Sequence, residues 1–189
     1  MNRKDPQFRL MAYLKADLQR QHAFSYGHDV SAPGSWVTLL SPRFVPVFLC
    51  RVAYWFYCLH IGSLARAVSL LNFFLFGIEI DVCCPIGKGL FLPHTQGTVI
   101  GAWSIGENAT IFQGVTLGAS KFDPSCQKTT RPVLGDGVLV GAGAKILGGI
   151  VIGNGVKIGA NAVVLHSLPP DVVAVGIPAK IIKRPLGTA

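Results

Sequence analysis

Aliphatic side chains recur at every sixth position in the C-terminal half of the chain. The longest unbroken run consists of Leu134, Val140, Ile146, Ile152, Ile158 and Val164. A period of six fits neither the 3.6-residue repeat of an α-helix nor the two-residue alternation of a flat strand. Three residues after each of the first five aliphatic positions stands a residue that accepts a positive φ at low cost, namely Gly137, Gly143, Gly149, Gly155 and Asn161. The pattern predicts short strands and left-handed corners wound into a β-helix with a narrow apolar core.

The six-residue repeat continues upstream with two interruptions. Its further aliphatic and corner positions are Val99, Ile105, Asn108, Ile111, Gly114 and Leu117. Ile86 and Leu92 begin one register earlier, with Gly89 at their corner, so one residue slips before Val99. A longer break separates Leu117 from the run that starts at residue 134. Loops that leave a rigid scaffold often carry function, so we expect functional residues at both interruptions, with neutral insertions as the alternative.

The first part of the chain lacks this repeat and carries helical patterns instead. The spacing of its apolar residues predicts an amphipathic helix over residues 6–22, with Asp17 and Arg20 on the polar side. We therefore predict a mainly β protein preceded by a short α-helical region. The predicted parts are the helical region 1–76, the β-helix domain 77–183 with a loop at about 118–133, and a tail at 184–189.

Two apolar helices are predicted over residues 42–60 and 63–76, ended by Gly62 and Gly77. No uninterrupted apolar run reaches the roughly 18 residues of a membrane-spanning helix. Charged residues also interrupt any secretory signal at the N-terminus. We therefore expect a soluble cytoplasmic protein whose apolar helices are buried against each other and a neighbouring subunit. Peripheral membrane contact is the alternative and is not favoured; it draws on eight Lys and Arg against three Asp in residues 1–78.

The composition argues against several kinds of partner and site. The net charge is +8, but Lys and Arg are scattered without an aromatic-interleaved basic stripe, so no nucleic acid is expected. The five cysteines have neither metal-ligand spacing nor an adjacent histidine, so we expect reduced thiols and no cysteine nucleophile. Only His94 and His166 lie in the repeat region. That is too few for a three-histidine metal centre, and no metal is expected.

One histidine has the surroundings of a general base. His94 lies in the stretch where the register slips. Glu79 and Asp81 lie upstream, separated by one residue, so they face the same side of a strand. A histidine with a carboxylate to orient it is the minimum equipment for activating a hydroxyl. A purely structural histidine is the alternative.

Ordered motifs in residues 72–183 carry a more specific signal. They are Gly-Ile-Glu-Ile at 77–80, Ile-Gly-Lys-Gly at 86–89, His94, Val-Ile-Gly at 99–101, Phe-Gln-Gly-Val-Thr-Leu-Gly at 112–118, Gly-Ala-Gly-Ala-Lys at 141–145, Ile-Gly-Ala at 158–160 and Gly-Ile-Pro-Ala at 176–179. In this order they resemble the catalytic half of the serine O-acetyltransferases, in a short form without the large N-terminal helical domain. The resemblance implies a left-handed parallel β-helix and a homotrimer. It also implies active sites between adjacent subunits, with acetyl-CoA lying along the coil.

The resemblance also assigns roles to individual residues. His94 corresponds to the general base that takes the proton of the acceptor hydroxyl, and Glu79 to the carboxylate that orients it, with Asp81 as the alternative carboxylate. The family's contacts with acetyl-CoA fall on Gly118, Ala119, Ala142, Ala160, Lys180 and Lys183. For the alanines the alternative is coil packing, and for the lysines it is a solvated basic tail.

The chain departs from the family on the side of the acceptor. Pro93 stands where the family carries an Asp that helps to hold the serine amino group. Thr130 and Arg131 stand where the family carries Arg-His, which engages the substrate carboxylate. Arg131 can still bind a carboxylate in bidentate geometry, so both residues are candidates for substrate binding. The last residues are Leu-Gly-Thr-Ala rather than a long tail ending in Ile, so no complex with the sulfhydrylase is expected.

The resemblance therefore predicts an acetyl-CoA-dependent serine O-acetyltransferase of cysteine biosynthesis. It would convert L-serine and acetyl-CoA to O-acetyl-L-serine and CoA by direct transfer. The first alternative is an O-acetyltransferase acting on a sugar or polysaccharide hydroxyl, which suits Pro93, the altered loop and the apolar, basic N-terminal region. The second is a non-catalytic trimeric scaffold. His94 and Glu79 argue against the scaffold, because neither is needed to pack a coil.

Overall fold

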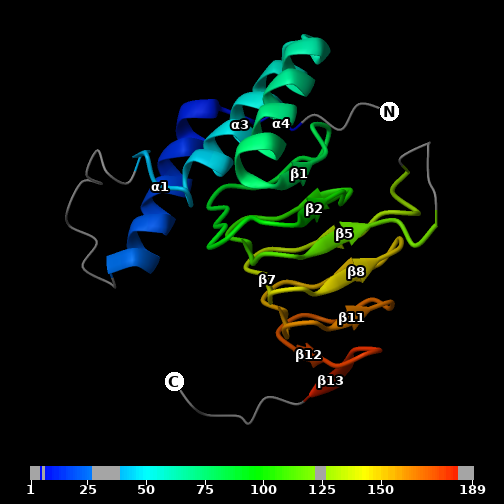
Figure 1. Cartoon of the computed structure of the whole chain (residues 1–189). Coiled ribbons are helices and arrows are strands. Elements are labelled where there is room, and N and C mark those ends of the chain that lie inside the picture. Colours follow the sequence, from blue (N-terminus) through cyan, green and yellow to red (C-terminus); the bar gives the residue numbers. More distant parts are fainter. Residues whose placement is uncertain (1–4, 6, 27–38, 122–126, 183–189) are drawn as a thin grey trace.

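Helices stand over one end of a column of short strands in the computed structural model of the chain (Figure 1). The structure describes residues 5, 7–26, 39–121 and 127–182. Within these residues no helix combines the length and apolar character needed to cross a membrane. The column winds downward from the helices, and its last coil carries the C-terminal strand (Figure 1). The prediction of a helical region followed by a β-helix is confirmed in its order of elements.

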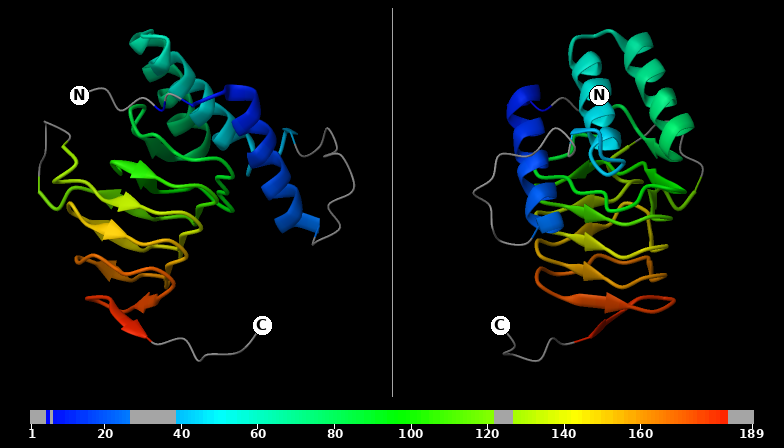
Figure 2. Two further views of the ribbon diagram at one scale, coloured as in Figure 1. Left: turned by 180° about the vertical axis from the view of Figure 1, so that it is seen from behind. Right: turned by 60° about the vertical axis from the view of Figure 1, so that its left-hand side comes forward.

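The described helices are α1 (Leu10–Tyr26), α3 (Val45–Cys58) and α4 (Gly62–Phe76). Helices α3 and α4 lie side by side above the coils, and α1 runs down beside the first coils (Figure 2). Gly77 ends α4 with a φ of +62°, as expected. The prediction that Gly62 ends the preceding helix is wrong, because Gly62 is the first residue of α4. His60, with a φ of +65°, makes the left-handed turn between the two helices instead.

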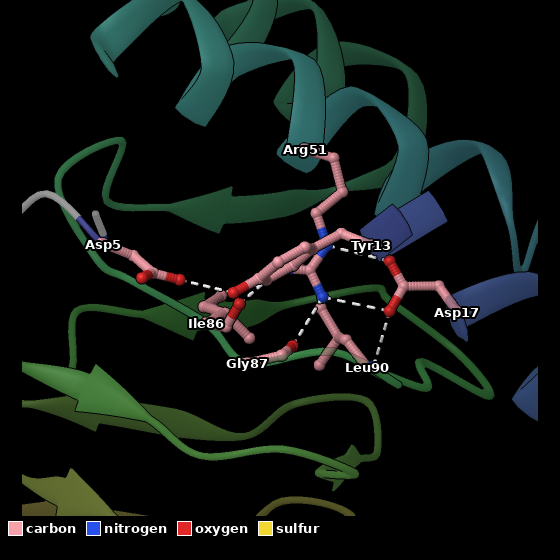
Figure 3. Close-up of polar contacts among 7 residues, drawn as sticks. All are labelled: Asp5, Tyr13, Asp17, Arg51, Ile86, Gly87 and Leu90. Carbon is pink, nitrogen blue, oxygen red and sulfur yellow. Dashed lines mark hydrogen bonds and ion pairs between the residues drawn. The ribbon is translucent and has the colours of Figure 1, made fainter. Parts of the chain in front are cut away.

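Asp17 does not lie on a solvent-facing side of α1, which corrects the amphipathic prediction. Its exposed fraction is 1%, and that of Arg51 on α3 is 2%. The two form an ion pair with 2.8 Å between Arg51 Nε and Asp17 Oδ2 (Figure 3). Arg20 is half-buried and donates a hydrogen bond of 2.7 Å to the carbonyl of Asn108. Asp17 and Arg20 of α1 thus both contact the rest of the fold.

The same ion pair fastens the helices to the first coil of the column. Arg51 donates to the carbonyls of Ile86 and Gly87, and the Leu90 amide donates to Asp17 Oδ1 at 2.8 Å (Figure 3). On α4, Ser69 Oγ donates to the carbonyl of Ile80 at 3.1 Å. Each described helix therefore supplies a polar side chain to the backbone of the first coil.

The strands of the column form three sheets. The first contains β1 (Ile78–Ile80), β2 (Thr98–Ile100), β5 (Thr116–Gly118), β8 (Lys145–Leu147) and β11 (Val163–Val164). The second contains β4 (Thr110–Ile111), β7 (Leu139–Val140), β10 (Lys157–Ile158), β12 (Val173–Val175) and β13 (Lys180–Ile182). The third contains β3 (Ser104–Ile105), β6 (Val133–Leu134) and β9 (Val151–Ile152). Neighbouring strands are parallel except β12 and β13, so each coil rests on the next in register.

The six-residue repeat forms the core, as predicted. Its aliphatic residues from 134 to 164 are each at most 2% exposed. Positive φ angles occur at the predicted corners Gly89, Asn108, Gly114, Gly137, Gly143, Gly155 and Asn161. Gly149 is the exception, because Gly148 takes the positive φ of +100°. Gly149 is needed for a different reason: a Cβ there would lie 2.0 Å from the carbonyl oxygen of Thr129, where the long loop returns to the column.

Candidate active site

A cavity of about 440 Å³ lies at the carboxyl ends of β1, β2 and β5. Five of the residues singled out from the sequence line it, namely Glu79, Asp81, Gly118, Ala119 and Arg131. They come from β1, from β5 and from the return of the long loop, so segments some 50 residues apart in the chain meet here. We call this space the carboxyl-end cavity.

Glu79 projects outward from the centre of β1. It is exposed between the buried Ile78 and Ile80, because alternate residues of a strand face opposite sides. It also borders a second cavity of about 360 Å³ against α4, which is lined by Arg66, Ser69, Leu70, Phe73 and Val82. Glu79 therefore lies between the two cavities.

Asp81 and Arg131 face each other in the carboxyl-end cavity. Asp81 Oδ2 is 3.4 Å from Arg131 Nη1, and the two side chains are 21% and 18% exposed. The Cys83 amide donates to Asp81 Oδ1 at 3.0 Å, and Arg131 Nη1 donates to the carbonyl of Gly101 at 2.9 Å. The backbone thus holds both charged groups in place.

Gly101 also lines the carboxyl-end cavity, and no role was predicted for it from the sequence. A Cβ on Gly101 would lie 3.0 Å from Arg131 Nη1 and 3.1 Å from the carbonyl oxygen of Leu117. A side chain there would push the guanidinium away from its place in the cavity. A glycine directly after a strand is the signal that marks such a close approach.

Thr130 does not line the carboxyl-end cavity. Its hydroxyl donates to the carbonyl of Gln127 at 2.8 Å, and its amide donates to the same carbonyl at 3.2 Å. Thr130 therefore closes a turn that precedes Arg131. Of the two predicted substrate-binding residues, the structure brings Arg131 to the cavity and gives Thr130 a place in the supporting loop.

His94 lies at the opposite, amino ends of the strands of the first sheet. It is exposed and does not line the carboxyl-end cavity. Thr95 Oγ1 donates to the carbonyl of Phe76 at 2.8 Å, and the Gly97 amide donates to the carbonyl of Gly77 at 2.9 Å, so this segment is pinned to the end of α4. The four steps along the chain from Gly97 to Gly101 cover about 13 Å at roughly 3.3 Å each. That is the approximate separation between the two ends of the strands.

Ala142 and Ala160 belong to the same corner as His94. The amide of Gly143 donates to the carbonyl of Gln113 at 2.8 Å, and the amide of Asn161 donates to the carbonyl of Ala142 at 2.8 Å. These backbone bonds stack the corner from coil to coil, and we call it the amino-end corner (residues 94–97, 113–114, 142–143 and 160–161). The predicted acetyl-CoA residues therefore divide, with the alanines here and Gly118 and Ala119 at the other end of the strands.

The remaining candidates have simpler surroundings. Lys180 is exposed on β13, where it pairs with Val175, and Lys183 lies outside the described residues.

Cys50 is buried, and burial raises the pKa of its thiol to about 11, which keeps it protonated at neutral pH. Cys126 lies outside the described residues. Among the residues that are described, no group of three His, Cys, Asp or Glu side chains could hold a metal ion.

A family model, sequence relatives and solved structures that resemble this chain agree with one another. The family model "Bacterial transferase hexapeptide (six repeats)" matches residues 131–166. A serine acetyltransferase of Helicobacter pylori strain J99 is 45% identical over 159 residues, which are 82% of this chain and 91% of the relative. The crystal structure of Neisseria gonorrhoeae serine acetyltransferase has a TM-score of 0.81 at 34% identity, over 95% of this chain and 67% of that one.

Two further solved structures contain ligands. The complex of the N. gonorrhoeae enzyme with serine has a TM-score of 0.76 at 32% identity and covers 90% of this chain and 68% of that one. A serine acetyltransferase in complex with CoA has a TM-score of 0.74 at 29% identity and covers 92% of this chain and 69% of that one. Together these likenesses confirm the predicted left-handed parallel β-helix.

Proposed function

Because the chain belongs to the serine acetyltransferase family and is an acyltransferase, we propose that it transfers an acetyl group from acetyl-CoA to the hydroxyl of L-serine. The observation that carries the choice of acceptor is Arg131 in the carboxyl-end cavity. Its guanidinium is held toward the cavity by Gly101, where it meets a substrate carboxylate. The name of the H. pylori relative and the serine complex of the N. gonorrhoeae enzyme support the same acceptor.

Acetyl-CoA, when bound, supplies the acetyl group as a thioester. The residues of this chain suit that ligand, because an added Cβ on Gly118 would meet nothing within 4 Å, so open space lies beside the backbone. Ala142 and Ala160 have small side chains, so the ligand can approach the backbone at the amino-end corner. Lys180 presents a positive charge on β13 for the phosphates of CoA. From the resemblance of the sequence to the family, we assign Ala119 to the thioester end of acetyl-CoA and Lys183 to its phosphate end. The CoA complex of a family member supports acetyl-CoA as the co-substrate.

In the proposed reaction His94 acts as general base. It accepts the proton of the serine hydroxyl as that oxygen attacks the thioester carbonyl, and it returns the proton to the departing sulfur. No side chain of the enzyme is acylated. Glu79, projecting from the neighbouring strand β1, orients the imidazole and stabilises its protonated form.

We propose that the protein works as a homotrimer with its sites between subunits. The residues assigned to one site lie at opposite ends of the strands of the first sheet in a single chain. A closed three-fold assembly brings one surface of each subunit against a different surface of the next. It thereby places the amino-end corner of one subunit, with His94, against the carboxyl-end cavity of its neighbour, with Arg131.

Mixed oligomers test this arrangement. His94→Ala and Arg131→Ala variants carrying different tags should each be inactive alone. Trimers that contain both chains have one interface with an intact His94 and an intact Arg131. After purification on both tags we expect roughly one third of the wild-type rate of CoA release. Mixed trimers as inactive as either parent would place both residues of a site in one chain, and a mass other than that of a trimer would contradict the assembly.

The choice of acceptor is tested by measuring CoA thiol release with L-serine and with a panel of sugars. We expect kcat/KM for L-serine to exceed that for any sugar by ~10²-fold or more, because a neutral polyol lacks the carboxylate that the Arg131 guanidinium would bind. Turnover with sugars alone would replace serine with a sugar as the acceptor. No turnover with any acceptor would favour the non-catalytic scaffold.

A further inference from the structure

We propose that Asp81 selects acceptors that carry a free ammonium group, so that Asp81 and Arg131 together recognise the two charged groups of an amino acid. This inference rests on the serine acetyltransferase function proposed above and adds a specificity residue to it. The alternative role for Asp81, orientation of His94, is not adopted, because Asp81 lies against Arg131 in the carboxyl-end cavity.

The carboxylate of Asp81 is held in a fixed direction. Its own amide donates to the carbonyl of Ile100 at 2.9 Å, and its Oδ1 accepts the Cys83 amide at 3.0 Å. Oδ2 is the oxygen that faces Arg131. On the other side, Gly101 accepts a hydrogen bond from Arg131 Nη1 at 2.9 Å. Both charged groups are thus positioned by backbone atoms as well as by each other, which is the preorganisation a selective site needs.

The spacing of the pair suits a zwitterion. A fully formed ion pair of this kind has an N···O distance of about 2.7–2.9 Å, and Asp81 and Arg131 stand at 3.4 Å. In an amino acid the carboxylate and the ammonium group are attached to the same carbon, so the groups that bind them must also be neighbours. The substrate carboxylate then pairs with Arg131 and the ammonium group with Asp81.

The charges around the cavity favour the same class of acceptor. Glu79, Asp81 and Arg131 give two negative charges and one positive charge on its lining. A substrate carboxylate that pairs with Arg131 brings a further negative charge beside Asp81, whose side chain is about four-fifths buried. Like charges close together in a largely buried place are unfavourable, and an acceptor that also carries an ammonium group offsets this repulsion. A hydroxy acid brings the negative charge without the ammonium group, and a neutral polyol offers an ionic partner to neither Asp81 nor Arg131.

The test compares L-serine with 3-hydroxypropanoate, which has the same hydroxyl and carboxylate and lacks the ammonium group. The wild type should prefer L-serine by ~10²-fold or more in kcat/KM. Asp81→Asn keeps an oxygen for the Cys83 amide and removes the charge. It should lower kcat/KM for L-serine by about 10- to 100-fold, chiefly through KM, without lowering that for 3-hydroxypropanoate. The same ratio can be read from the inhibition constants of L-alanine and propanoate, which need no turnover.

Asp136→Asn is the matched control, because Asp136 is an exposed aspartate that also accepts a backbone amide, that of Glu107. Its preference for L-serine should equal that of the wild type, and thermal unfolding checks that both variants are folded. An equal loss for both acceptors in Asp81→Asn would overturn the proposal and leave Asp81 as a residue that only positions Arg131. A wild type that does not acetylate L-serine would instead remove the proposed function, which is a separate outcome.

Discussion

Replacing His94 by alanine should lower kcat for the acetylation of L-serine by about 10²- to 10⁴-fold, the usual effect of losing a general base. The melting temperature should stay at the wild-type value. The imidazole is exposed, so its removal opens no hole in the core. The backbone on either side remains tied to the end of α4 through Thr95 and Gly97. The measurement is CoA thiol release at saturating L-serine and acetyl-CoA.

His166→Ala is the matched control for His94→Ala. His166 is an exposed histidine of the same β-helix, and its removal should leave kcat unchanged. Added imidazole should restore part of the activity of His94→Ala, because it can take over proton transfer in the space left by the side chain. A loss below 10-fold in His94→Ala, or an equal loss in His166→Ala, would remove His94 from the mechanism.

Glu79→Gln extends the same test to the orienting carboxylate. Glu107→Gln is its control, since Glu107 is an exposed glutamate elsewhere on the column. Glu79→Gln should reduce kcat by a smaller factor than His94→Ala does, because the base itself remains. Asp81→Asn should leave kcat for L-serine nearly unchanged while raising KM. The opposite result, with kcat falling in Asp81→Asn and not in Glu79→Gln, would exchange the roles of the two carboxylates.

Arg51→Met should destabilise the protein by about 3–5 kcal/mol, because removing one partner of a buried ion pair leaves the other charge unpaired. Burial alone would lower the pKa of the Arg51 guanidinium, but its hydrogen bonds with Asp17 and the charge attraction of that carboxylate and of neighbouring groups together raise that pKa. Arg51 is therefore charged at every accessible pH. In the variant, Asp17 would keep only the Leu90 amide, and the carbonyls of Ile86 and Gly87 would lose their donor.

Urea unfolding at a fixed protein concentration measures the effect of Arg51→Met, since the stability of an oligomer depends on concentration. Arg43→Met is the control: Arg43 is exposed, and its replacement should change the free energy of unfolding by less than about 0.5 kcal/mol. Arg51→Lys keeps the charge but not the planar fork, so it should fall between the wild type and Arg51→Met. It also provides a measurable variant if Arg51→Met does not fold. An unfolding midpoint of Arg51→Met equal to that of the wild type would contradict the prediction.

The sequence predicted best those features that depend on local spacing. An aliphatic residue every six positions requires a buried column, and a corner residue such as Asn161 is recognisable because few side chains accept a positive φ. The positive φ falls at Gly148 and not at the predicted Gly149, and Gly149 instead lies against Thr129, 20 positions away in the chain. Local spacing could not reveal that long-range contact.

Long-range contacts also explain two features that the sequence did not predict. One is the burial of Asp17, and the other is the separation of the site residues between the two ends of the strands. A charged residue on a helix is usually solvated, and only its partner Arg51, 34 residues later, makes burial of Asp17 favourable. The six-residue register does place His94 shortly before a strand of the first sheet and Arg131 shortly before a strand of the third sheet. It does not say how far apart these two places lie in the folded coil. The pairing of Asp81 with Arg131 likewise depends on the path by which the long loop returns.

The polar side chains by which the helices bind the first coil also cover the open end of the column. Parallel coils hydrogen-bond along the axis of the column, so a bare terminal coil is an open edge on which another chain can stack. Ser69, Arg51 and Asp17 occupy backbone groups of that coil at Ile80, Ile86, Gly87 and Leu90. A second column therefore meets no free backbone groups at these positions with which to continue the hydrogen-bonded strands. At this end of the solenoid the buried ion pair thus takes the place that a capping repeat has in other solenoids.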